Sequence, residues 1–263
     1  MAFIALEYHD VIGETLADDS GFPGAAANSY KLDPSSFASH LDAVAASGAR
    51  VLAADTNAVE RSPRENIVFL TFDDGGVSAL DVIAPALERR GWVGHFFIAT
   101  DCIGKRGFLG ADDLRALVRR GHVVGSHSRS HPLRMSSLSP AQLDDEWGAS
   151  MATLRDVLGV TPVVASVPGG ALSAAVIDHA AAAGIRILFT SEPTTRVMVR
   201  GECTVLGRYT LRRAHGGRVA ASLLAPSPTA RVSQWLAWNG KKVAKRLGGN
   251  AYLRVRASLF RGR

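Results

Sequence analysis

Cysteine is scarce in this chain of 263 residues, which contains only Cys102 and Cys203. Two cysteines do not make a disulfide framework or a cysteine-based zinc site. No run of about 18 apolar residues occurs, so no transmembrane helix is predicted. The first residues lack the basic start and the long apolar core of a signal peptide. From these absences we expect a cytoplasmic protein.

Acidic residues are missing from Cys203 to the C-terminus, a region that carries thirteen Lys and Arg. The rest of the chain holds 17 basic and 24 acidic residues, so the net charge of +6 arises from a basic tail on an acidic body. No known nucleic-acid motif accompanies this charge, and we expect no nucleic-acid partner.

Within the tail, apolar side chains recur at helical spacing and lysines lie mostly elsewhere, which predicts an amphipathic helix that stops at Gly248-Gly249. The apolar positions are Val232, Trp235, Leu236, Val243 and Leu247. Such a helix can lie on an anionic membrane surface. The alternative is a helix that packs Trp235 and Trp238 onto the protein body and leaves its lysines in solvent.

The remaining sequence alternates between strand-like and helix-like segments, which indicates an α/β domain with a parallel sheet. A closed or partly closed barrel of seven strands fits this count, and an open doubly wound sheet is the alternative. Residues 10–34 read as a long surface segment beside the strands. The predicted strands are 3–8, 67–72, 94–99, 122–126, 163–167, 185–190 and 204–210, and the predicted helices include 36–46, 77–90, 111–120, 140–158 and 173–183.

Two short motifs carry the chemistry. Thr71-Phe72-Asp73-Asp74-Gly75 ends one predicted strand, and His127-Ser128-Arg129-Ser130-His131-Pro132 follows another. Adjacent carboxylates at a strand end point in different directions, so one can bind a metal while the other serves as a base. In a helical turn, histidines four apart share one face. Each motif alone could be an ordinary turn, but both occur where α/β enzymes place their sites.

These motifs resemble the first two motifs of the polysaccharide deacetylase family, also called the NodB-homology or carbohydrate esterase family 4 domain. Tyr8-His9-Asp10-Val11, Phe96 to Thr100 and Gly121 to Gly125 resemble flanking stretches, so the likeness covers roughly residues 1–215. The resemblance implies an irregular seven-stranded (β/α) barrel for residues 1–215. Residues 216–263 would form a basic C-terminal extension.

The resemblance also implies roles for individual residues. Asp74, His127 and His131 would bind a divalent metal, and Asp73 would be the general base. Zinc is the default ion for these ligands, and cobalt, iron, nickel or manganese also suit one carboxylate and two imidazoles.

The sequence departs from the family pattern at three places. Ser166-Val167-Pro168-Gly169-Gly170 stands where the family has Arg-x-Pro, so the arginine that orients the base is missing, although a Gly169 N–H can still stabilise an oxyanion. Glu192 occupies the region of an aspartate-and-tryptophan motif and is a candidate pocket carboxylate or a residue at the start of a helix. The late Leu-x-His motif is absent, which leaves His215 and His9 as candidates for the general acid.

The predicted function is metal-dependent removal of N-acetyl or O-acetyl groups from a carbohydrate or glycoconjugate, by a hydrolase of carbon–nitrogen non-peptide bonds. The substrate would be an acetylated sugar, an oligosaccharide or a lipid-linked glycan, the last reached by peripheral contact of the tail with the inner membrane surface. Two alternatives remain: a small-molecule amidohydrolase of the same fold, or an inactive sugar-binding or scaffold protein.

The metal site leads to a first prediction. The purified protein should contain about one divalent ion per chain, and Asp74→Ala, His127→Ala and His131→Ala should each lose it, because a site of three donors does not survive the loss of one. Elemental analysis of the four proteins measures this. Full retention of metal in all three variants would contradict the assignment.

Overall fold

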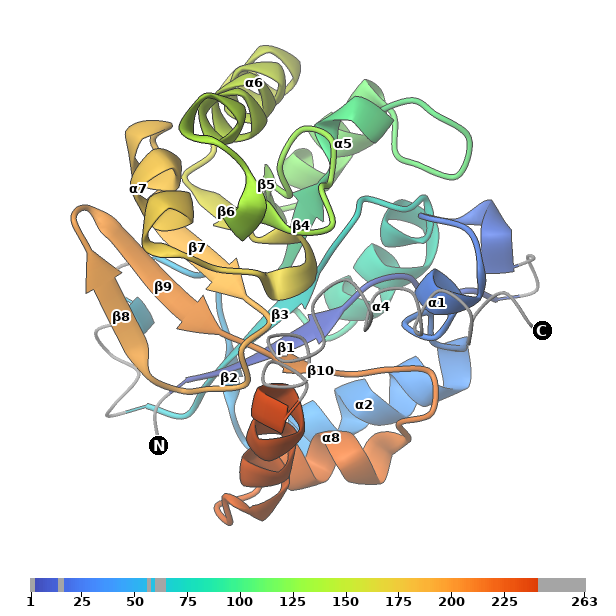
Figure 1. Ribbon diagram of the computed structural model, residues 1–263. Helices are drawn as coiled ribbons and strands as arrows, with labels where there is room; N and C mark the ends of the chain where they lie inside the picture. Colours follow the sequence, from blue (N-terminus) through green and yellow to red (C-terminus); the bar gives the residue numbers. More distant parts are fainter. Residues whose placement is uncertain (1–2, 14–16, 56–57, 60–64, 241–263) are drawn as a thin grey trace.

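The computed structural model describes residues 3–13, 17–55, 58–59 and 65–240. Its core is one ten-stranded sheet in the order β10-β1-β3-β4-β5-β6-β7-β9-β8, with β2 paired to β3 (Figure 1). All pairs are parallel except β8 with β9. The strands are β1 (Ile4–Tyr8), β2 (Arg50–Val51), β3 (Ile67–Phe72), β4 (Gly94–Ile98), β5 (Val123–Ser126), β6 (Val164–Ser166), β7 (Ile187–Thr190), β8 (Val197–Arg200), β9 (Cys203–Gly207) and β10 (Tyr209–Thr210).

The two ends of the sheet are joined through one residue. β9 pairs with β7, β10 pairs with β1, and Arg208 alone separates β9 from β10. The predicted strand 204–210 is therefore a bent strand that closes the sheet into an irregular barrel. The seven-stranded barrel prediction is confirmed, and the open doubly wound alternative is wrong. The short strands β2 and β8 were not predicted from the sequence. β2 has only two residues, and β8 is an exposed hairpin arm without the buried apolar run of a core strand.

The barrel interior follows the two-residue period of the strands. Side chains from six strands form one buried apolar cluster, which a flat open sheet could not bring together. Its strand members include Ala5 of β1, Ile67 and Phe69 of β3, Phe97 of β4, Val164 of β6, Ile187 and Phe189 of β7, and Leu206 of β9. Two residues further along these strands, on the same face, the positions are polar. They are Glu7, Thr71, Asp73, Ser166, Ser191 and Arg208. A polar layer therefore lies above the apolar interior, at the carboxyl ends of the strands.

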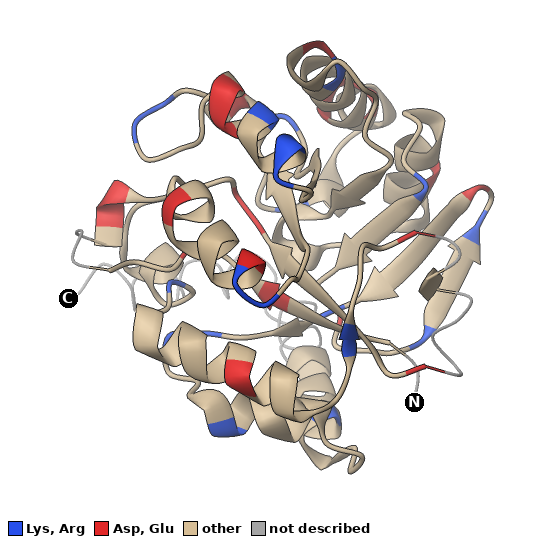
Figure 2. Cartoon of the chain, turned by 180° about the vertical axis from the view of Figure 1, so that it is seen from behind, with Lys and Arg blue, Asp and Glu red and all other residues tan. Residues whose placement is uncertain are grey.

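Helices cover the outside of the barrel (Figure 1). α2 (Pro34–Ala46) and α8 (Gly217–Leu224) pack with α4 (Ala84–Glu88) and α5 (Ala111–Arg119) on one side, and α6 (Pro140–Leu158) packs with α7 (Ala174–Ala182) on the other. Short helical segments are η1 (Ala17–Asp19), α1 (Ala25–Asn28), η3 (Thr100–Cys102), η4 (Met135–Ser137) and η5 (Pro168–Gly170). The Lys, Arg, Asp and Glu residues lie mainly on helices and loops, while most of the sheet is uncharged (Figure 2).

Helix ends follow local sequence signals. The side chain of Asp33 accepts a hydrogen bond from the Ser36 N–H and caps α2, whereas Ser139 and Gln142 form a capping box at α6. The helix predicted over 77–90 is instead divided into a π-helical segment, η2 (Ala79–Ile83), and α4. Pro85 lacks the N–H that would continue regular α-helical bonding across this junction.

The predicted C-terminal extension is helical as far as it is described. Ala220, Leu223 and Leu224 of α8 belong to the same buried core as α2, and residues 229–240 form a further helix. In the described chain, the helices include none that is long and apolar enough to cross a bilayer. The predicted positions Lys241, Lys242, Val243, Lys245 to Leu247 and Gly248-Gly249 lie outside the described residues.

Candidate active site

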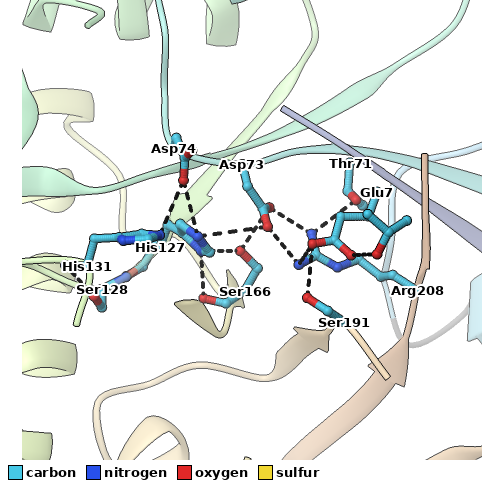
Figure 3. Close-up of polar contacts among 12 residues, drawn as sticks. Glu7, Thr71, Asp73, Asp74, His127, Ser128, His131, Ser166, Ser191 and Arg208 are labelled. Carbon is cyan, nitrogen blue, oxygen red and sulfur yellow. Dashed lines mark hydrogen bonds and ion pairs between the residues drawn. The ribbon is translucent and has the colours of Figure 1, made fainter. Parts of the chain in front are cut away.

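The two motifs meet at the carboxyl end of the barrel (Figure 3). Asp73 and Asp74 follow β3, and the loop 127–132 follows β5, a neighbour of β4 in the sheet. The histidine loop is not the helical turn that the spacing suggested. Its imidazoles still converge, with ring centres 5.0 Å apart.

Backbone strain is concentrated at this site. Among the described residues, the only non-glycine positions with positive φ are Asp74 (77°), Ser128 (62°) and His131 (57°). The left-handed region costs a residue with a Cβ about 1 kcal/mol or more, and such strain gathers at functional sites. It turns the Asp74 carboxylate away from that of Asp73 and brings His131 back toward His127.

Three donors form a pocket suited to a metal ion. Asp74 Oδ1 lies 3.5 Å from His127 Nε2 and 3.4 Å from His131 Nε2. Two ligands bound at about 2.1 Å to a tetrahedral ion lie about 3.4 Å apart, so the spacing fits. Asp74 Oδ1 is also buried without a hydrogen-bond partner among the described residues. A buried carboxylate oxygen that makes no hydrogen bond is costly unless a cation meets it, so these residues fit a divalent metal.

The surroundings hold the donors in place. His127 Nδ1 lies 2.6 Å from Ser166 Oγ and 3.1 Å from the Ser166 carbonyl, which leaves Nε2 for a metal. Buried Glu146 of α6 accepts hydrogen bonds from the N–H groups of Arg129 and Ser130 and from the Ser130 hydroxyl. This carboxylate therefore anchors the histidine loop to the barrel wall.

Asp73 is held by an arginine that the sequence analysis did not identify. Fully buried Arg208 donates through Nη1 and Nη2 to the two carboxylate oxygens of Asp73, each at 2.7 Å. The same guanidinium lies 3.4 Å from Glu7 and donates to Thr71. Ser166, which stands at the position of the missing motif arginine, also donates to Asp73 at 3.1 Å. The guanidinium that contacts Asp73 thus comes from the β9–β10 junction.

The charges set the protonation of the site. Burial alone would raise the pKa of Asp73, but Arg208 and His127 outweigh it and hold this pKa well below its usual range. Burial also opposes ionisation of Asp74, and His131 and His9 overcome it, so the pKa of Asp74 is lowered. Burial lowers the pKa of His127 to about 4. At neutral pH the carboxylates are therefore ionised and His127 is neutral, the state in which it can bind a metal.

Of the two histidines predicted as general acid, one lies in the site and the other lies beside it. Ring and carboxylate atoms of His9, Glu7 and Asp73 lie within 4.8 Å of one another, so His9 belongs to the site. Because Arg208, Ser191 and Thr210 already hold the carboxylates of Asp73 and Glu7, this second cluster is a poor metal site. His215 lines a side cavity, with Nδ1 accepting from the Arg212 N–H.

The predicted oxyanion turn follows β6 as η5. Gly169 and Gly170 have φ of 60° and 65°, and a Cβ at Gly169 would lie 3.1 Å from the Leu133 carbonyl. Pro168 has no N–H, and the Gly170 N–H donates to the Val167 carbonyl. Of the three, Gly169 remains the candidate donor. The backbone carbonyl of Glu192 accepts from the Arg208 N–H at 3.0 Å, so this residue helps to hold the strand junction.

The fold and these donors define a class: an irregular (β/α) barrel with a carboxylate and two imidazoles at the carboxyl ends of its strands. Residues 60–188 match the family model described as Polysaccharide deacetylase. The resemblance seen in the motifs is therefore confirmed over residues 60–188.

Individual relatives are distant. The chain is 22% identical over 173 residues to YxkH of Bacillus subtilis (strain 168), covering 64% of this chain and 62% of YxkH. It is 28% identical over 138 residues to Chitin deacetylase 1 of Cryptococcus neoformans, covering 52% of this chain and 28% of that protein. It thus spans less than two thirds of either relative. Among solved structures, the Streptococcus pyogenes deacetylase PplD aligns with TM-score 0.68 and 17% identity, over 86% of this chain and 99% of PplD.

The arginine contact leads to a second prediction. In Arg208→Gln, burial would no longer be opposed by the guanidinium, so the pKa of Asp73 should rise and the acid limb of the kcat/KM–pH profile should move to higher pH. The free energy of unfolding should fall by roughly 3–5 kcal/mol, as expected when one partner of a buried ion pair is removed.

A pH–rate series and a denaturant titration measure the two effects. Arg200→Gln is the matched control, because it breaks an exposed arginine–carboxylate pair with Asp178 and should leave the profile in place. An unmoved acid limb in Arg208→Gln would show that Arg208 does not control Asp73.

Proposed function

We propose that this protein is a metal-dependent hydrolase that removes N-acetyl groups from a carbohydrate or glycoconjugate, with Asp73 as the base and Asp74, His127 and His131 as metal ligands. The observation that carries the proposal is the division of the carboxylates. Asp74 faces two imidazoles with an unpaired oxygen, while Asp73, one residue away, is held ionised by Arg208.

The chemistry follows from these positions. A divalent ion held by Asp74, His127 and His131, zinc by default, would supply Lewis-acid polarisation of the acyl carbonyl and would lower the pKa of nearby water. Asp73 accepts a proton from the attacking water as its oxygen bonds to the acyl carbon. The Gly169 N–H donates to the oxyanion that develops on the carbonyl oxygen. The carbon–nitrogen bond then breaks as the amine takes up a proton, and acetate and a free amino sugar leave.

His9 fits the proton donor better than His215 does. His9 lies with Asp73 and Glu7, and its Nδ1 is buried without a hydrogen-bond partner among the described residues. His215 instead contacts Arg212 and supplies its carbonyl to His40. We therefore assign the general acid to His9 and place His215 at the side of the site.

The same contacts argue against an inactive scaffold. Arg208 keeps the carboxylate of Asp73 charged beside three metal donors, at the cost of burying an ion pair. A protein that only binds sugar does not need such a carboxylate. A small-molecule amidohydrolase would use the same centre, so substrate size distinguishes the two hydrolases. The structural relative PplD was solved in complex with acetate, which is the product that deacetylation would release.

A third prediction separates base from ligand. Asp73→Asn should keep the bound metal but lower turnover by roughly 10² to 10⁴, the usual contribution of a positioned base. Acetate release from N-acetylated glycans, measured beside elemental analysis, tests both parts, with Asp74→Ala as the metal-losing comparison. Parental activity in Asp73→Asn would overturn its role.

Membrane contact through the C-terminal tail is a second proposal, for which one surface offers support. On the helix 229–240, Val232, Trp235 and Leu236 are 48%, 44% and 59% exposed, and they share one face. Trp238, in contrast, touches the barrel at Gly170. Of the two tryptophans that the packing interpretation placed on the protein body, Trp238 therefore makes that contact, and Trp235 is left for the proposed membrane contact. A lipid-linked glycan would suit an enzyme docked by that exposed face.

The fourth prediction tests this contact. The full-length protein should co-sediment with vesicles that contain anionic lipid at low salt and should dissociate as salt is raised, because screening weakens the attraction of a basic tail. Trp235→Ser should weaken the binding. Absence of co-sedimentation at low salt would end the membrane proposal and leave the deacetylase proposal intact.

A further inference from the structure

The segment that follows β1 reaches one of the proposed metal ligands. The ring centre of Phe22 lies 4.7 Å from that of His131, and His127 is the other ring in contact with this imidazole, at 5.0 Å. Phe22 is half-buried, and Phe108 packs edge-on against it with ring centres 5.1 Å apart. A segment outside the chemical motifs therefore places an aromatic ring on a metal donor.

The backbone that carries Phe22 is held by a buried lysine. Lys31 is only 1% exposed. Its Nζ donates to three backbone carbonyls at 2.6, 2.6 and 2.7 Å, those of Ala17, Ser20 and Phe22. An ammonium group has three N–H donors, so these carbonyls use all of them. Burial of the charge is costly, and the charge-assisted hydrogen bonds offset that cost while they fix the course of the segment.

The same segment is fastened to the chain that follows Asp74. Asp10 Oδ1 accepts from the Ser20 hydroxyl at 2.5 Å and from the Ser78 hydroxyl at 2.7 Å. The Asp10 carboxylate also fills the space that a Cβ on Gly76 would need, so the two backbones approach closely there. The segment is therefore fixed relative to the turn that carries the carboxylate ligand.

His131 depends on such packing more than His127 does. Ser166 contacts His127 Nδ1 and so sets the orientation of that ring. His131 has a strained backbone, with φ of 57°, and its side chain is 22% exposed. Its Nε2 lies 3.4 Å from Asp74 Oδ1, and rotation of the ring about the Cβ–Cγ bond would carry Nε2 away from this oxygen. An aromatic ring against the imidazole restricts that rotation.

We propose that Phe22 is a positioning residue for the metal site. Its ring holds the His131 imidazole with Nε2 toward Asp74, and Lys31 holds the segment that presents the ring. Residues that orient metal ligands commonly change metal affinity by about 10- to 100-fold when they are mutated. The proposal rests on the metal-dependent function proposed above, and it gives the segment 10–34 a role in that function.

The test measures the dissociation constant of Zn²⁺ by competition with a chromophoric chelator at fixed pH. Phe22→Ala should weaken zinc binding about tenfold, whereas Phe22→Tyr keeps the ring and should retain the parental affinity. Trp92→Ala is the matched control, because Trp92 is also half-buried but precedes β4, at the opposite end of the strands from the site. Unchanged zinc affinity in Phe22→Ala, or an equal loss in Phe22→Tyr or in Trp92→Ala, would overturn the role of Phe22.

A second variant tests the support of the segment without changing the ring. Lys31→Met should also weaken zinc binding, with a thermal melt confirming that the protein is folded. The double variant of Phe22→Ala and Lys31→Met should bind zinc no more weakly than the worse of the two single variants, because both changes remove the same contact. Additive losses would show that Lys31 does not act through Phe22 and would overturn that part of the proposal.

The zinc titration also separates this proposal from the function on which it rests. A parent protein that binds no zinc would overturn the metal-dependent function and the role of Phe22 with it. Zinc binding by the parent that Phe22→Ala leaves unchanged would overturn the positioning role alone.

Discussion

The bidentate contact between Arg208 and Asp73 is the interaction on which the site depends. Arg208 occupies the single position between β9 and β10, where the barrel closes, and its charge fixes a carboxylate that follows β3. Closure of the sheet and ionisation of the proposed base are therefore coupled. A barrel that opened at this junction would leave both buried charges unpaired, which costs several kcal/mol.

The polar layer above the apolar interior explains how such charges are tolerated. Glu7, Thr71, Ser166 and Ser191 all take part in the network around the Arg208–Asp73 pair. Hydrogen bonds from several strands replace the water that these groups lose on burial. Among the described residues, Asp74 Oδ1, His9 Nδ1 and Arg208 Nε are left without a hydrogen bond, and the position of Asp74 Oδ1 beside two imidazoles, with the strained backbone of Asp74 and His131, marks the place where a metal would be held.

Where the resemblance implies an arginine after β6, this chain has Ser166, and the guanidinium that contacts Asp73 comes from another part of the barrel. Ser166 keeps the position after β6 but offers a hydroxyl, and Arg208 reaches the same carboxylate from the other side of the barrel. The same argument applies to Trp238. It comes from the helix 229–240, yet it lies on Gly170, in the turn that follows β6.

The sequence by itself determined the α/β class, six barrel strands and the bent seventh, most helices, and the grouping of Asp73 and Asp74 with His127 and His131, because periodicity and short motifs are local properties. The sequence also indicated where Arg208 lies. It comes two residues after Leu206 on the same strand, so both side chains face the barrel interior. Its pairing with Asp73, the clamp by Glu146 and the position of Trp238 were decided only by the tertiary structure. Arg208 and Asp73 are 135 positions apart, Glu146 lies 16 to 17 positions from the loop that it anchors, and Trp238 lies 68 positions from Gly170. These contacts exist only after the sheet closes and the helices pack.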